Sequence, residues 1–292
     1  MKKKRSSWIY LVLGIMLFSL ITVSALPLVG SVIDGQQPAR DPNSQVITFS
    51  QQELAMLEAE ASGYQKVLER EPNNETALRG LLQIKLQQKD IAGTIAPLEK
   101  LTHVDPEQTE YGVLLAQAKQ QIEDYEGAAA AYKEVLAEHP GDLYALGGIT
   151  NLYLVRELPE RAIALLKKTI ESAEGADSST AVAINQESVE LLLGEVYANQ
   201  ERYGEAIALY DRLAELDQTD FRPILAKALV LEQKGDLEAA KPILQQAYVA
   251  APENYKDQIG QEMERVVKSI ETAEREAAPA APADTKQSKV EQ

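Results

Sequence analysis

The chain has 292 residues, of which 45% are hydrophobic but only 5% are aromatic, and it contains no cysteine. Alanine and leucine supply most of the apolar content, which is typical of helices rather than sheets. Four of the 29 basic residues lie at positions 2–5, so the remaining 25 stand against 45 acidic residues. This negative charge excludes nucleic-acid binding, and the lack of cysteine excludes disulfides and thiolate chemistry.

The first part of the chain is a predicted membrane anchor. Residues 8–29 contain no charge and match the roughly 20 residues that a spanning helix needs. Because the basic cluster precedes them, the positive-inside rule predicts residues 1–7 in the cytosol and the rest of the chain across the membrane. The alternative is a secretory signal cleaved after Ala25, although the apolar run continues beyond that residue. Residues 30–50 are rich in Gly, Pro, Gln, Asn and Ser and form a predicted spacer.

A regular repeat follows the spacer. The prolines at 72, 106 and 140 are evenly spaced, and Pro252 fits the same period if residues 176–185 accommodate an insertion. The spacing divides the chain into five repeats of equal length, which are 75–108, 109–142, 143–176, 187–220 and 221–254.

Residues of similar size recur in the same columns of these repeats. The twentieth column holds Thr94, Ala128, Ala162, Ala206 and Ala240, and the twenty-fourth holds Leu98, Tyr132, Leu166, Tyr210 and Leu244. Small residues permit two helices to cross closely, and large ones pack beside the crossing. Each repeat is therefore predicted to be a pair of helices with a short polar turn between them.

This pattern resembles the tetratricopeptide repeat (TPR) family. The resemblance is carried by the small residues in the eighth column, the aromatic eleventh residues Tyr153 and Tyr197, the twentieth-column alanines and the prolines in the thirty-second column. It implies an all-α fold, a right-handed α-solenoid of about five and a half helical hairpins, the half repeat lying over residues 51–71.

The chain departs from the family pattern at several positions. Lys85 and Lys119 occupy the eleventh column, and Pro97 and Pro242 fall inside second helices, where we expect a kink or unpaired carbonyl groups. An amphipathic helix from residue 254 to 276 is predicted to cap the solenoid, which then spans residues 51–276. Residues 277–292 form an Ala/Pro-rich tail that cannot build a core and is predicted to be disordered.

No catalytic or metal-binding motif is visible in the sequence. The two histidines, His103 and His139, are predicted near the ends of second helices, where a partial positive charge is favourable. There is no glycine-rich phosphate loop and no nucleophile motif. We therefore predict neither an enzyme nor a cofactor or metal site.

Function is instead expected in the groove that, by the resemblance, the first helices line. In the first three repeats the groove columns are rich in side-chain amides, which offer donors and acceptors to an extended partner, with Arg79 and Tyr144 as charged and aromatic anchors. A clamp for heat-shock-protein carboxylates needs several cations, and only Arg79 is present. The predicted partner-binding residues are Arg79, Gln83, Gln87, Gln117, Gln120, Gln121, Tyr144 and Asn151.

The overall layout is similar to that of the membrane-anchored TPR proteins of cyanobacterial thylakoid biogenesis. This resemblance implies a scaffold that holds a partner enzyme at the membrane, with protochlorophyllide oxidoreductase and chlorophyll synthesis as the expected partner and pathway. Such an enzyme works on the cytosolic side, whereas the charge rule places the repeats on the opposite side. The alternative is a periplasmic or envelope TPR chaperone or assembly factor, which cleavage after Ala25 would favour.

Overall fold

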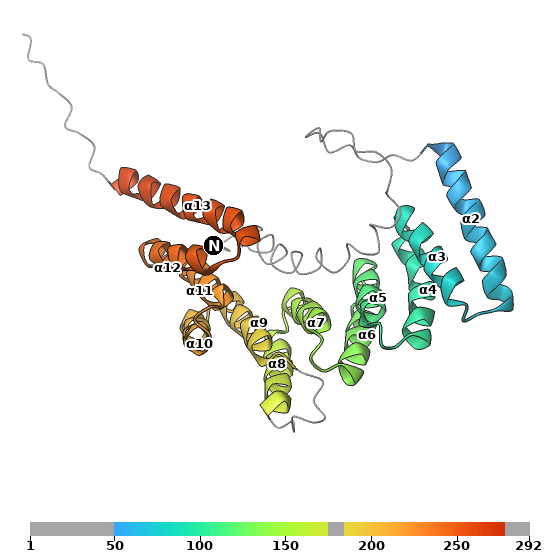
Figure 1. Ribbon diagram of the computed structural model, residues 1–292, viewed down its shortest axis with the longest axis horizontal. Coiled ribbons are helices and arrows are strands. Elements are labelled where there is room, and N and C mark those ends of the chain that lie inside the picture. Colours follow the sequence, from blue (N-terminus) through green and yellow to red (C-terminus); the bar gives the residue numbers. More distant parts are fainter. Residues whose placement is uncertain (1–49, 175–183, 278–292) are drawn as a thin grey trace, which may run out of the picture. The chain divides into compact units, whose positions relative to one another are not determined.

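The computed structural model describes residues 50–174 and 184–277, and all regular structure within these residues is helical (Figure 1). The all-α prediction is confirmed. The helices are α2 (Gln51–Arg70), α3 (Glu75–Gln87), α4 (Ile91–Val104), α5 (Thr109–Gln121), α6 (Tyr125–Glu138), α7 (Leu143–Val155), α8 (Pro159–Glu174), α9 (Gln186–Asn199), α10 (Tyr203–Leu216), α11 (Phe221–Lys234), α12 (Leu237–Ala250) and α13 (Glu253–Ala277).

None of the helices in the described ranges is both long and apolar enough to cross a bilayer. The predicted anchor at residues 8–29 lies outside the described residues, as do the spacer up to residue 49 and the tail from residue 278. Residues 175–183, which contain most of the expected insertion, also lie outside them.

The helices form two compact units. Unit 1 contains α2 to α7, and unit 2 contains residues 159–172 of α8 together with α9 to α13. From α2 to α7 in unit 1 and from α9 to α13 in unit 2, helices that follow one another in the sequence also pack on one another, as α3 on α4 and α11 on α12 (Figure 1). The odd-numbered helices from α3 to α11 are the first helices of the repeats, and the even-numbered helices from α4 to α12 are the second.

The columns of the repeat predict burial correctly. Every twentieth-column residue is at most 1% exposed, and every twenty-fourth-column residue is at most 3% exposed. The seventh column holds the buried residues Leu81, Leu115, Ile149 and Leu193 in the first four repeats. In the fifth repeat Lys227 takes this position and pairs with Asp211 at 2.5 Å. The first helices of the repeats begin at Glu75, Thr109, Leu143, Gln186 and Phe221.

The turns between paired helices share one backbone conformation. The fifteenth-column residues Lys89, Glu123, Glu157 and Glu201 have φ between 56° and 65°, and Gly235 has φ 90° in the same column. Aspartate then caps the second helix in three of the repeats, since Asp90, Asp124 and Asp236 each accept a backbone N–H three residues further on. A residue in the left-handed region followed by an N-cap reverses the chain within a few residues.

The four departures from the family pattern are accommodated in simple ways. Lys85 donates to Asp90 at 2.8 Å, and Lys119 pairs with Glu99 at 2.9 Å, so both ammonium groups that replace an aromatic ring have a carboxylate partner. The Lys85 ammonium group and the Gly93 N–H lower the pKa of Asp90. Helices α4 and α12 continue through Pro97 and Pro242, and neither proline ends its helix.

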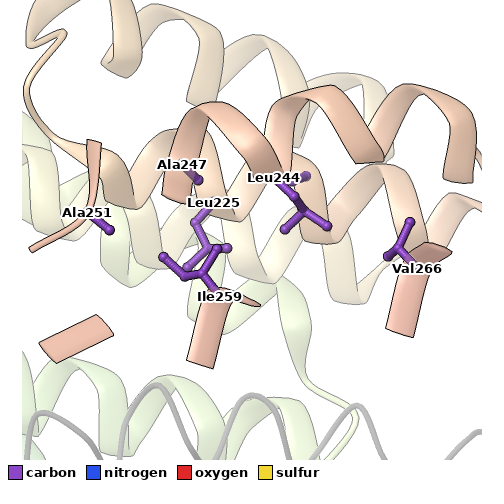
Figure 2. Packing of buried hydrophobic residues seen from close by; sticks show 7 residues of the cluster. Leu225, Leu244, Ala247, Ala251, Ile259 and Val266 are labelled. Carbon is purple, nitrogen blue, oxygen red and sulfur yellow. The ribbon is translucent and has the colours of Figure 1, made fainter. Parts of the chain in front are cut away.

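Each unit ends on a helix that packs by one face. In unit 1, α2 contributes Ala61 to a small cluster with Leu81 and Ile84 of α3. In unit 2, α13 places Ile259 and Val266 against the cluster formed by α11 and α12, as Figure 2 shows for Ile259 beside Leu225. The buried stripe of α13 is the one that its amphipathic sequence predicts, and the opposite side of this helix is exposed.

Candidate protein-binding site

The predicted partner-binding residues lie on the three first helices of unit 1. Six side-chain amides lie along these helices and form what we call the amide face: Gln83 and Gln87 of α3, Gln117, Gln120 and Gln121 of α5, and Asn151 of α7. Three of them occupy the ninth column of successive repeats. Helix α5 contacts α7, which sets the columns of these two helices side by side, and α4 packs on both α3 and α5.

The amide face is open to ligands. Gln83, Gln87, Gln121 and Asn151 are exposed, and Gln117 and Gln120 are half-buried. None of the six makes a side-chain hydrogen bond within the described ranges 50–174 and 184–277. An amide offers two N–H donors and a carbonyl acceptor, so the face presents a row of donors and acceptors that the fold itself does not use.

Arg79 differs from the amides because the fold already holds its guanidinium group. It pairs with Glu75 at 2.5 Å, lies 3.7 Å from Asp105, and stands over the ring of Tyr111 at 5.7 Å from the ring centroid. Two carboxylates balance its charge, and the group keeps 43% of its side-chain exposure. We conclude that Arg79 forms a polar edge of the surface rather than an unpaired cation.

Tyr144 is half-buried in the first turn of α7. That turn is fixed by Asp142, whose carboxylate accepts the Ala145 N–H at 2.8 Å and the Thr109 hydroxyl at 2.7 Å. The second bond joins the start of α5 to the start of α7. It therefore fixes the spacing of two helices of the amide face, and it places Tyr144 at the end of α7 remote from Asn151.

In unit 2 the corresponding side chains bridge neighbouring helices. Arg222 of α11 donates to the Ser188 hydroxyl of α9 at 3.1 Å, and Gln233 of α11 donates to the Ala198 carbonyl at 3.2 Å. Gln233 stands in the thirteenth column, the same as Gln87 and Gln121 of the amide face. The same residue type in the same column thus serves stacking in unit 2 and is unbonded in unit 1.

A second bridge joins α11 to α13. Arg265 donates to both carboxylate oxygens of Glu232, one of them at 2.7 Å, and to Glu262 at 2.9 Å. Two-point pairing of a guanidinium and a carboxylate is among the strongest hydrogen-bonded ion pairs. Since Glu232 and Arg265 belong to different helices that are far apart in the chain, no local spacing in the sequence could reveal this pair.

Two acids of α9, one buried and one half-buried, were not identified from the sequence. Glu190 is 4% exposed and pairs with Arg212 of α10. Glu195 is half-buried in the ninth column, and loss of hydration raises the pKa of its carboxyl group to about 7. The sequence does not single out either residue, because the burial of an acidic residue on a helix depends on contacts with the neighbouring helix.

A metal or catalytic centre finds no support among the described residues. No group of three or more His, Asp or Glu side chains within them is arranged to hold a metal ion. His103 lies in the last turn of α4 with its Nδ1 atom 2.7 Å from the Glu99 carbonyl oxygen, and His139 follows the last residue of α6. Both histidines therefore stand at helix ends, as predicted.

Comparison with known proteins agrees with this architecture. Models of the tetratricopeptide repeat match residues 122–183, 191–223 and 222–254. The crystal structure of yeast Tom70 has a TM-score of 0.50 at 14% identity, over 77% of this chain and 45% of that one. The chain contains tetratricopeptide repeats over these matched residues. Members of this family typically act as scaffolds for protein–protein interaction rather than as enzymes.

Two further proteins are similar to this TPR protein. The structure of TTC0263, a thermophilic TPR protein of Thermus thermophilus, has a TM-score of 0.45 at 17% identity and covers 66% of this chain and 98% of that one. Cellulose synthase operon protein C of Pseudomonas fluorescens (strain SBW25) is 29% identical over 160 residues, which are 55% of this chain. The matched part spans only 10% of the Pseudomonas protein.

Proposed function

We propose that this TPR protein is a membrane-anchored scaffold whose amide face binds an extended segment of a partner protein. The single observation that carries the proposal is the set of six amides on α3, α5 and α7 without hydrogen bonds in the described residues. An extended chain presents backbone N–H and C=O groups that need partners when it is bound. Amides can satisfy both kinds of group without regard to the partner's side chains.

The energetics favour several weak contacts over one strong anchor. Each hydrogen bond contributes about 0.5–1.5 kcal/mol, so three ninth-column amides acting together account for roughly a hundredfold in affinity. Arg79 adds little net charge, because Glu75 and Asp105 already balance it. Its exposed guanidinium edge and the ring of Tyr144 supply hydrogen-bonding and stacking surfaces at the margin of the amide face.

The test is capture of partners from native membranes with a triple variant, Gln83→Ala, Gln117→Ala and Asn151→Ala. We expect the proteins retained by the wild-type chain to be lost from the triple variant. The control is the pair Gln245→Ala and Gln246→Ala, two exposed glutamines on α12 of unit 2, which should retain every partner. If the triple variant and the control retained the same partner proteins, the proposal that the amide face binds them would be contradicted.

The membrane part of the proposal rests on the uncharged residues 8–29. Full-length protein should stay in membranes after an alkaline carbonate wash, and a chain lacking residues 1–33 should be water-soluble with unchanged helical content. Mature protein that begins at Leu26 and is washed off would show cleavage after Ala25 and contradict the anchor.

We also propose the partner class that the layout of anchor, spacer and repeats suggests, an enzyme of chlorophyll synthesis such as protochlorophyllide oxidoreductase at a thylakoid membrane. A direct binding assay between the two purified proteins tests it, with the triple amide variant as the control. The side of the membrane on which the repeats lie must be measured together with binding, because a partner on the cytosolic side can bind only repeats on that side.

The second candidate is an assembly factor of the bacterial envelope. It is favoured by the likeness of 160 residues to a protein named for a cellulose synthase operon. The two candidates differ in the side of the membrane on which the repeats lie. Protease protection of the repeats in sealed vesicles of known orientation separates them.

A further inference from the structure

Glu195 is an acidic side chain of unit 2 that the fold does not explain. It lies on α9 between the two hydrogen bonds that bridge this helix to α11, one at Ser188 and the other at Ala198. Helices α9 and α11 contact each other, and Glu195 is half-buried at this junction. It occupies the ninth column, which holds the three regularly spaced amides of unit 1.

The other acids of unit 2 that are not exposed each have a cation. Glu190 pairs with Arg212, Asp211 with Lys227, Asp220 with Arg222, and Glu232 and Glu262 with Arg265, while Glu187 lies in the field of Arg222. Glu195 is the exception, because within the described ranges its carboxyl group has no ion pair, no hydrogen bond and no neighbouring cation that acts on its pKa. The fold pairs five of these acids and leaves Glu187 near Arg222, so the lack of any cation beside Glu195 points to a partner outside the chain.

The surroundings of Glu195 are uncharged. On α10 the phenol of Tyr210 is the titratable group that interacts with it, and the Tyr210 hydroxyl donates to the Leu191 carbonyl at 3.4 Å. On α11 three charged groups are engaged elsewhere, Arg222 by Asp220, Lys227 by Asp211 and Glu232 by Arg265. Burial raises the pKa of Glu195 to about 7, so near neutral pH the carboxyl group is only partly ionised. A bound cation would restore its charge.

We propose that Glu195 is a recognition site for a lysine or arginine side chain of a partner protein that lies along α9. The aliphatic stem of such a side chain can lie against the half-buried Leu191, one turn before Glu195, while its charged end reaches the carboxylate. This site lies in unit 2 and goes beyond the amide face of unit 1. The site in unit 2 confers a preference for one basic residue, whereas the amide face of unit 1 binds the partner's backbone.

The experiment selects peptides from a random-sequence display library with the full chain in detergent. The wild-type chain is compared with Glu195→Gln and with a matched control, Glu215→Gln, an exposed glutamate of α10. Glutamine keeps the size and polarity of the side chain, and circular dichroism verifies that each variant is folded. We expect lysine or arginine at one position of the peptides selected by the wild-type chain and the control, with at least tenfold less enrichment for Glu195→Gln.

A second measurement tests whether the Glu195 carboxylate and the basic side chain of the peptide interact directly. One selected peptide is synthesised with its basic residue and, separately, with norleucine in place of lysine or citrulline in place of arginine. The uncharged peptide should bind the wild-type chain at least tenfold more weakly, and both peptides should bind Glu195→Gln equally. Peptides without a basic preference, no selected peptide at all, or an equal loss on Glu195→Gln would each overturn the proposal.

The result at Glu195 can be distinguished from a result that contradicts binding at the amide face. The triple amide variant keeps Glu195, so it should still prefer the basic peptide over its uncharged form. Loss of partner capture by the triple variant with the basic preference retained supports both sites, whereas a basic preference without any effect of the triple variant supports only the site at Glu195.

Discussion

Units 1 and 2 are built from the same repeat, but the polar side chains of their first helices differ in their hydrogen bonding. In unit 1 the ninth- and thirteenth-column amides, Gln83, Gln87, Gln117, Gln121 and Asn151, make no hydrogen bonds within the described residues. In unit 2 the side chains of the first helices bind neighbouring helices, as Gln233 binds the Ala198 carbonyl. The columns that form the core are the same in both units. The difference teaches that the core columns define the fold, while the remaining columns are available either for stacking or for binding.

The largest expected effects come from the core, where the units should not differ. Leu98→Ala in unit 1 and Leu244→Ala in unit 2 each truncate a twenty-fourth-column leucine that is at most 1% exposed. Each should lower the free energy of unfolding by about 2–5 kcal/mol, because transfer and cavity costs add. Urea denaturation followed by circular dichroism measures both. A loss in one unit only would show that the core columns are not equivalent.

The next largest effect concerns the charged side chains, whose loss should destabilise unit 2 more than unit 1. Arg265→Ala leaves Glu232 and Glu262 unpaired, and their side chains are only 14% and 20% exposed, so we expect a loss of about 2 kcal/mol. Arg79→Ala leaves the more exposed Glu75 and Asp105 unpaired and should cost less than about 1 kcal/mol. Equal losses in urea denaturation would contradict the view that charged bridges stabilise unit 2 more than unit 1.

Glu195 gives a pH-dependent test within unit 2. Its pKa is about 7 in the folded chain against an ordinary 4.5, so the folded state holds the proton more tightly, and stability falls as the pH rises from about 4.5 to 7. Glu195→Gln removes this dependence. The variant should exceed the wild type by about 1–3 kcal/mol at pH 8, allowing for partial hydration, and match it near pH 4.5. Glu215→Gln should show no such pH dependence.

The smallest effects concern the amides themselves. Gln83→Ala, Gln117→Ala and Asn151→Ala should each change the free energy of unfolding by less than about 0.5 kcal/mol, because no hydrogen bond is lost. Gln233→Ala removes the bond to the Ala198 carbonyl and should cost about 1 kcal/mol. If the unit 1 substitutions were the more destabilising ones, the amide face would be a structural feature and not a binding surface.

Much of this fold follows from the period of the repeat. The period of the repeat predicted the buried alanines such as Ala128 and Ala206 and the large residues beside them, because the packing of paired helices repeats with the sequence. It did not predict the left-handed backbone at Glu123 or Glu157, since only Gly235 carries the residue type that signals this conformation. In those turns the chain reversal overrides the local preference of glutamate.

The sequence assigns the candidate residues to the first helices of the repeats, but it does not give the contacts of their side chains. The register of the repeats is sufficient to place Gln83, Gln117 and Asn151 on one face. The pairing of Arg79 with Asp105, and that of Glu232 with Arg265, depends on separate helices meeting at particular angles. No pattern within one helix contains that information, so the sequence could not tell an open amide such as Gln87 from a bonded one such as Gln233.

The central claim is that partners bind the amide face of unit 1. A photo-crosslinking amino acid placed at position 117, in the middle of the amide face, tests it most directly, with the same amino acid at position 245 on the exposed side of α12 as the control. Irradiation of native membranes should give a covalent adduct of the chain and its partner from position 117 and none from position 245. Adducts from position 245 alone would contradict the account.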